Sequence, residues 1–205
     1  MKRSDVTKQK IFAAAETEFC EKGIYGARID SIAEAADVNK RMIYHYFTNK
    51  EGLYTAVLRE VYARLADLEI HLLESESDCK EAVRKLVYLY FEFLNANPSF
   101  VRMVMWENLC GGEHFNAASI REVKDSATVA MKALVRRGKE SGVFRPDAIE
   151  VNILLAFHTF CFPYFSNMHT LSRLLSLDLS VEDNIRRHAE FVARAILGQL
   201  VAEEM

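Results

Sequence analysis

The chain has 205 residues, of which 50% are hydrophobic, and its formal net charge is −3 at pH 7. This length and apolar content allow one or two compact domains with a buried core. A slightly negative net charge excludes a polycation that coats nucleic acid through bulk charge alone. Only 8 glycines and 3 prolines interrupt the chain, which favours long helices over a sandwich of short strands.

No signal for export or for a metal site is visible. The charged residues at positions 1–5 are not followed by an apolar stretch, so no secretory signal is expected. No run approaches the roughly 18 to 20 apolar residues of a membrane span, and we expect a cytoplasmic protein without membrane contact. Cys20, Cys79, Cys110 and Cys161 are far apart, which predicts reduced and mostly buried thiols without a bound metal or cofactor.

Three amphipathic segments open the chain. The first covers residues 7–22, where apolar side chains recur at helical spacing and Gly23 follows as a C-terminal cap. Two shorter helices are predicted at 28–36 and 40–46. Between them, Asp37 is a residue type that tolerates a left-handed backbone, and Asn39 is a favoured N-cap. This layout predicts a helix-turn-helix, whose second helix enters the DNA major groove.

The remainder also favours helices, and no alternating strand pattern of useful length is present. Capping and breaking residues predict six further helices, which gives an all-α fold of about nine: Thr48-x-x-Glu51 opening a helix to about Leu73, Asp78 to about Asn95, Asn97-Pro98 to Gly111-Gly112, Ala117 to Gly142, a helix opened by Asp147-x-x-Glu150, and one opened by Ser180-x-x-Asp183 that runs to about Ala202.

The second short helix concentrates side chains that suit DNA. Basic and aromatic residues crowd into it, and Lys50 opens the next helix. Lysine and arginine neutralise phosphates, tyrosine hydroxyls donate to phosphate oxygens, and arginine can also hold a guanine edge with two hydrogen bonds. A solvated helix with half-buried tyrosines is the alternative interpretation of any single residue, but the whole cluster favours a DNA-binding surface.

The run from Ile29 to Leu53 reads IDSIAEAADVNKRMIYHYFTNKEGL. Together with Ile11, Ala15 and Phe19 in the preceding helix, it resembles the DNA-binding signature of the TetR repressor family over roughly residues 7–58. The resemblance implies an N-terminal three-helix DNA-binding domain at 1–50. It also implies a helical ligand-sensing and dimerisation domain at 51–205.

The resemblance further implies roles for individual residues. The helix at 40–46 would lie in the major groove, with Tyr44 and Lys50 on phosphates and the start of the preceding helix, near Arg28, against the DNA backbone. The sequence departs from the family pattern at Arg28, Asp37, Arg41 and Met42, and we expect the last two to face base edges. The predicted DNA-binding residues are Arg28, Asn39, Lys40, Arg41, Met42, Tyr44, His45, Tyr46 and Lys50.

The C-terminal part is rich in aromatic side chains at helical spacing, a pattern that core packing alone also produces. Pro163 inside an apolar helix and polar groups among apolar walls nevertheless favour a small-molecule pocket. The effector would be a small, mostly hydrophobic or aromatic molecule that cannot be named from the sequence. The predicted ligand-binding residues are Tyr90, Trp106, Phe157, His158, Cys161, Phe162 and Phe165.

The last helix has a wide apolar sector. A monomer would leave part of that sector in water, so we expect it to contact a second copy of the chain. The resemblance implies the same interface, built from the final two long helices of each subunit. The predicted dimer-interface residues are Ile185, Ala189, Val192, Ile196 and Leu200.

These patterns predict a ligand-responsive transcriptional regulator, expected to be a repressor, that binds a palindromic operator as a homodimer. No nucleophile elbow, phosphate-binding loop, H-E-x-x-H motif or dinucleotide loop indicates an enzyme. The alternative is a DNA-binding regulator controlled by a protein partner or by thiol oxidation rather than by a small ligand.

Overall fold

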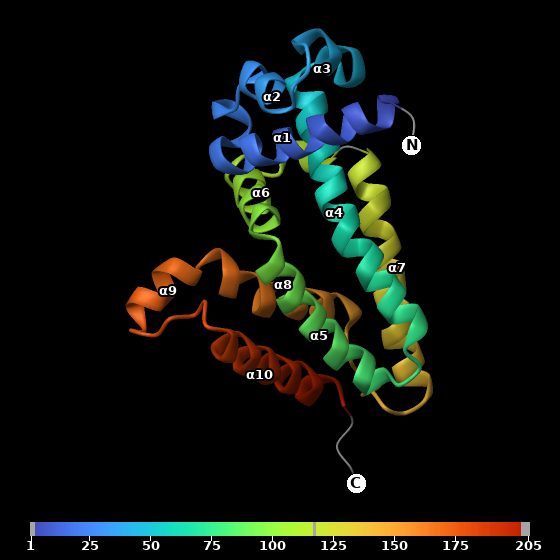
Figure 1. Ribbon diagram of the computed structural model, residues 1–205. Helices are drawn as coiled ribbons and strands as arrows, with labels where there is room; N and C mark the ends of the chain where they lie inside the picture. The colour runs from blue at the N-terminus through green and yellow to red at the C-terminus, as the bar shows by residue number, and fades with distance from the viewer. Residues whose placement is uncertain (1–2, 117, 202–205) are drawn as a thin grey trace. The chain divides into compact units, whose positions relative to one another are not determined.

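The computed structural model describes residues 3–116 and 118–201, and in these ranges it is all-helical, as predicted. The sole extended feature among the described residues is an isolated bridge between Phe144 and Val201. The helices, labelled in Figure 1, are α1 (Arg3–Gly26), α2 (Ile29–Ala35), α3 (Lys40–Phe47), α4 (Lys50–Ser75), α5 (Cys79–Ala96), α6 (Pro98–Leu109), the 3₁₀ helix η1 (Glu113–Asn116), α7 (Ala118–Glu140), α8 (Glu150–Ser166), α9 (Met168–Leu174) and α10 (Glu182–Leu200).

The described residues form ten α-helices rather than about nine, and α9 is the additional one. Pro163 lies inside α8, which continues for three more residues to Ser166. A separate short helix then begins at Met168, after Asn167. Residues 117 and 202, which we expected at helix ends, lie outside the described residues.

Two predicted helix caps are confirmed. The Asn39 side-chain oxygen accepts the backbone N–H of Arg41 at 2.8 Å, which starts α3. One Asp78 carboxylate oxygen accepts the N–H groups of Lys80 and Glu81 at 2.8 and 2.9 Å, which starts α5. Both caps satisfy N–H groups that have no partner within the helix.

The capping box predicted at Thr48 is wrong. Thr48 has φ 64°, in the left-handed region, and closes α3 instead of opening α4. The side-chain oxygen of Asn49 accepts the N–H of Gly52 at 2.7 Å and takes the capping role. The helix therefore begins one residue later than a Thr48 cap would place it, at Lys50.

The two other predicted capping boxes are also wrong. The carboxylate of Asp147 binds the guanidinium of Arg145 at 3.0 and 3.1 Å, so α8 begins without a side-chain cap. The hydroxyl of Ser180 donates to Asp178 at 2.6 Å, and α10 likewise begins without one. In both cases the side chain that we expected to cap the helix binds a residue two positions earlier in the sequence instead.

The chain packs as two compact units. The first runs up to Arg64 and also includes Ser99–Val123, and the second comprises Leu65–Pro98 and the chain from Lys124 onward. The packing boundary therefore does not fall at residue 50, because α4 continues through it. Its first turns are buried in the first unit through Leu53, Tyr54, Val57 and Leu58, each at most 1% exposed. The functional division into 1–50 and 51–205 stays a prediction.

The helices α1, α2 and α3 lie together in the first unit (Figure 1), and their buried side chains contribute to its core. One apolar side chain or more from each helix is fully buried there, which the helical spacing predicted. These residues are Ile11, Ala15 and Phe19 from α1, Ile32 from α2, and Ile43 from α3.

In the second unit α10 packs along α5 and also contacts α8. The five side chains that we predicted at the dimer interface face this internal core. Ile185, Ala189, Val192, Ile196 and Leu200 are between 0 and 7% exposed in the single subunit. These five side chains therefore belong to the core of the single subunit, and their role at a subunit interface stays a prediction.

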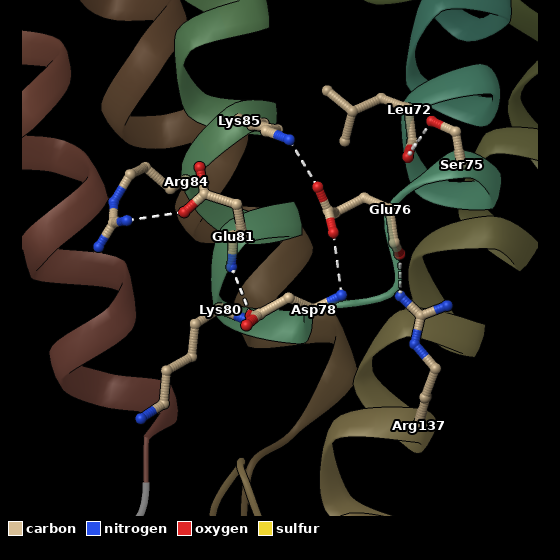
Figure 2. A network of polar contacts seen from close by, with 9 residues as sticks. All are labelled: Leu72, Ser75, Glu76, Asp78, Lys80, Glu81, Arg84, Lys85 and Arg137. Atoms are coloured by element: carbon tan, nitrogen blue, oxygen red, sulfur yellow. Dashed lines mark hydrogen bonds and ion pairs between the residues drawn. The ribbon is translucent and has the colours of Figure 1, made fainter.

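The turn between α4 and α5 is fixed by a polar network in the second unit (Figure 2). Arg137 of α7 donates to the backbone carbonyl of Glu76 at 2.7 Å and to the Cys79 sulfur at 3.4 Å. The Glu76 carboxylate in turn pairs with Lys85 at 2.6 Å and accepts the Asp78 N–H at 3.0 Å. The end of α4, the start of α5 and α7 are thus joined through residues 76–79.

Candidate DNA-binding surface and sensor region

The N-terminus of α2 is capped from α1. Its own N-cap residue, Arg28, supplies no side-chain cap. Instead the Glu18 carboxylate, which is 8% exposed, accepts the Arg28 backbone N–H at 3.0 Å and pairs with Lys22 at 2.8 Å. Burial alone would raise the pKa of Glu18, but the hydrogen bonds from Lys22 and Arg28 lower it below its ordinary value.

The same link between α1 and α2 is also held from α4. The Lys50 ammonium donates to the backbone carbonyl of Ala27 at 3.3 Å. That acceptor is neutral, so this bond does not offset the positive charge of the ammonium next to the start of α2. The position agrees with the predicted phosphate contact, although the contact itself stays a prediction.

The outer side of α3 presents the residues expected to contact DNA. Arg41, Tyr44 and His45 are exposed, with Tyr44 at 43%, while Met42 and Tyr46 are half-buried. Asp37 adopts φ 54° in the turn before α3, the left-handed backbone that its residue type was expected to tolerate. The helix-turn-helix geometry is therefore present, with its polar side chains on one exposed surface.

One cation of this surface is already paired. Lys40, the first residue of α3, lies 2.7 Å from the carboxylate of Asp30 in the first turn of α2. This hydrogen bond raises the pKa of Lys40 above its ordinary value. Sequence reasoning did not predict the pair, nor the cap that Glu18 provides. No local pattern signals either contact, because Glu18 lies ten residues before Arg28 and Asp30 lies ten residues before Lys40.

Trp106 of α6 packs against α1 in the first unit. Gly23 of α1 has φ 64° and ψ 177°, a backbone conformation nearly restricted to glycine. A Cβ atom there would lie 2.8 Å from two carbons of the Trp106 ring. The indole Nε1–H also donates to the Cys20 carbonyl at 3.1 Å. The bare backbone at Gly23 thus lets α6 approach α1 closely.

A buried carboxylate connects α6 with α4 and η1. Glu107, 3% exposed, accepts the N–H groups of His114 and Phe115 at 2.7 and 3.1 Å and the Tyr54 hydroxyl at 3.2 Å. The His114 ring nitrogen Nδ1 is a further 3.2 Å neighbour. Burial, followed by the charge of Glu107, raises the pKa of Tyr54.

In the second unit, aromatic side chains of α5 and α8 meet around Tyr90. Its ring lies 6.0 Å from that of Phe157 and 5.9 Å from that of His158. Tyr90, Phe157 and Cys161 are buried, and burial together with the charge of Glu69 on α4 raises the pKa of Tyr90. The ring of Phe165 packs against Phe91 of α5 at 5.5 Å.

Two of the predicted ligand-binding residues stand apart from this aromatic core. His158 is exposed rather than enclosed, although its ring stays edge-on to Tyr90. Trp106 belongs to the other compact unit, where α1 covers its ring. An open hollow of about 360 Å³ runs along α4 instead, lined by Asp67, Ile70, His71, Glu74 and Ser75, none of which we predicted.

Comparison with known proteins identifies the family. Residues 11–57 match the family described as "Bacterial regulatory proteins, tetR family", and residues 80–196 match "Tetracyclin repressor-like, C-terminal domain". The chain belongs to the TetR family. It is therefore a DNA-binding transcriptional regulator, and the match at 11–57 covers most of α1, all of α2 and α3, and the first turns of α4.

Individual relatives of this TetR-family chain are also regulators. The HTH-type transcriptional repressor NicS of Pseudomonas putida is 34% identical over 179 residues, which are 87% of this chain and 84% of that protein. The HTH-type transcriptional repressor SCO4008 of Streptomyces coelicolor is 37% identical over 152 residues, or 74% and 73% of the two chains.

Solved structures agree on the fold of the TetR-family chain. A TetR family transcription regulator from Marinobacter aquaeolei matches with a TM-score of 0.74 at 21% identity, and the match covers 98% of both chains.

None of the helices in the described ranges combines the length and apolar character that crossing a membrane requires. In the same ranges, no cluster of three or more histidine, cysteine, aspartate or glutamate side chains could hold a metal ion.

Gly23→Ala tests the contact between α1 and α6. An alanine would need a strained backbone and would clash with Trp106, so we expect a loss of about 1 to 3 kcal/mol of unfolding free energy. Trp106 is the single tryptophan, and its emission should shift toward longer wavelengths as the ring moves into water. Gly26→Ala is the control, because Gly26 lacks a positive φ and its new Cβ would meet only Lys22, at 3.2 Å. Equal unfolding midpoints and emission for the two variants would contradict the described contact.

Proposed function

We propose that this TetR-family chain is a repressor that binds a palindromic operator as a homodimer and is released by a small, mostly hydrophobic or aromatic effector. The observation that carries the DNA-binding part is the exposed outer side of α3, where Arg41, Tyr44 and His45 follow a helix-turn-helix. Both reported relatives are named as repressors, which supports repression rather than activation by this chain.

The proposed division of labour on α3 follows from chemistry. Arg41 is exposed near the start of α3, where a helix that enters the major groove brings side chains to base edges. The Tyr44 hydroxyl has one donor and the Lys50 ammonium has three, and both groups suit phosphate oxygens. Phosphate contacts fix the position of the protein but carry no sequence information, whereas base contacts do.

Arg41→Ala should therefore relax the base preference at one position of each half-site, by about 1 to 3 kcal/mol. Tyr44→Phe should weaken binding to operator and non-operator duplexes by a similar factor, because the lost hydroxyl faces a phosphate. Fluorescence anisotropy with single-base variants of the wild-type operator separates the two results. If Arg41→Ala leaves the ranking of these variants unchanged, Arg41 does not read a base.

We place the proposed subunit interface on the outer faces of α8 and α10. Val151 and Leu155 of α8 and Phe191 of α10 are between 54 and 56% exposed in the single subunit. The Phe191 ring stacks on His188 at 5.8 Å, which holds it in one orientation. Apolar side chains presented in this way favour contact with a second copy of the chain.

Phe191→Asp should convert the dimer into a monomer, because the carboxylate would have to be buried without a partner. Sedimentation at micromolar concentration measures the mass directly. Val129→Asp is the matched control, since Val129 on α7 is 65% exposed and outside the proposed interface. A Phe191→Asp variant that remains dimeric would place the interface elsewhere.

The proposed effector site is the aromatic core between α5 and α8, around Tyr90 and Phe157, with Cys161 and the half-buried Phe162 and Phe165 beside it. Aromatic walls offer apolar area and few charges, which suits a flat or hydrophobic molecule.

The Cys161 and Cys110 thiols do not favour control by oxidation. Burial raises the pKa of Cys161 to about 12 and also raises that of Cys110, so both stay protonated and weakly reactive near pH 7.

A screen of small hydrophobic and aromatic compounds tests the sensor. A true effector should raise the melting temperature of the wild-type chain and weaken operator binding by roughly 5- to 150-fold, the usual range of allosteric coupling. A Phe162→Ala variant should lose both effects, and His169→Ala, a change at an exposed histidine of this region, should keep them. A compound that still acts on Phe162→Ala binds elsewhere.

A further inference from the structure

The ion pair between Lys40 and Asp30 lies on the surface that faces DNA in the proposed function. Lys40 opens α3, and Asp30 lies in the first turn of α2, so the pair spans the two helices of the helix-turn-helix at 2.7 Å. The Lys40 side chain is 48% exposed and that of Asp30 is 75% exposed. Both groups are thus accessible to a DNA backbone, and neither is needed to fill the core.

The pair removes one positive charge from the surface as DNA meets it. Arg28 lies near Glu18, whose carboxylate pairs with Lys22, and Lys50 donates to a neutral carbonyl. Lys40 differs from both because it forms a direct ion pair with a carboxylate on this surface. An exposed ion pair is weak, so Lys40 can exchange Asp30 for a DNA phosphate. The Asp30 carboxylate would then lie unpaired beside the DNA, and its repulsion of the phosphates would offset the contact that Lys40 gains.

From this placement we infer that Asp30 is a specificity-determining residue, which prevents Lys40 from adding a phosphate contact and so limits binding to DNA without the operator. The inference rests on the proposed function. On non-operator DNA the protein binds through phosphate contacts alone, so it can shift along the duplex until each available cation lies near a phosphate. In the operator complex, base contacts fix the register, so an extra cation gains less.

The experiment measures binding of the full-length dimer to a fluorescent non-operator duplex of mixed sequence between 50 and 200 mM salt. Asp30→Asn should bind more tightly than wild type and steepen the dependence of log K on log salt by about 1.8, because each of the two subunits adds one phosphate contact worth about 0.9. The gain over wild type should accordingly be about 12-fold larger at 50 mM than at 200 mM. On the operator, the gain should be smaller.

Two matched variants decide whether Lys40 is the cause. In a Lys40→Ala background, Asp30→Asn should no longer change the salt slope. Glu34→Gln removes the same charge one helical turn further along α2, from an exposed side chain that forms no ion pair among the described residues, and should alter the slope less.

The proposal is overturned if Asp30→Asn leaves the slope unchanged. It is also overturned if the gain survives in the Lys40→Ala background or is matched by Glu34→Gln, because Asp30 would then act only as a distant charge. A wild-type chain that binds neither duplex would instead contradict the proposed function itself. Circular dichroism melting should show all variants folded, since both side chains of the pair are exposed.

Discussion

The close approach of α6 to α1 is the constraint on which the first compact unit depends. It requires a residue without a Cβ atom at position 23, where the indole of Trp106 occupies the space that a side chain would fill. The Nε1–H bond to Cys20 and the buried carboxylate of Glu107 then fix α6 relative to α1, α4 and η1. As a result, α6 shares the core of the first unit with α1 and α4.

This arrangement has a consequence for regulation. A regulator responds to an effector only if the two conformations differ in their affinity for it. Helix α6 follows α5 at Pro98 and packs in the first unit. A displacement of α6 would therefore disturb the packing of α1 and the bond between Glu18 of α1 and the backbone N–H of Arg28 before α2. The proposed effector site around Tyr90 lies on α5 and α8, so α5 provides the covalent connection between the site and this packing.

Local signals were sufficient for the fold and for the DNA-binding segment. The three N-terminal helices, the left-handed Asp37 and the Asn39 cap depend on neighbours within a few residues, which the sequence displays directly. Contacts between distant segments were not predictable in this way. The acceptor for the Arg28 N–H is Glu18, ten residues earlier, and the partner of Trp106 is α1. For α10, hydrophobic spacing identified an apolar face but not whether α5 or a second subunit covers it.

The charge of the proposed DNA-binding surface depends on pairing as well as on composition. Among its cations, Lys40 is paired with Asp30, whereas Lys50 donates to a neutral carbonyl. What such a surface offers to phosphates thus depends on which side chains have a carboxylate beside them. The same net charge, arranged differently, would give another dependence on salt.

Selection of bound duplexes from a random-sequence pool by the wild-type chain tests the central claim most directly. A dimer that places two α3 helices in successive major grooves should enrich an inverted repeat whose half-site centres lie about one helical turn, or slightly more, apart. The Arg41 side chain should then correspond to one strongly preferred base pair in each half-site. Enrichment of no sequence, or of a motif without two-fold symmetry, would contradict the assignment of α3 as the DNA-reading helix of a homodimer.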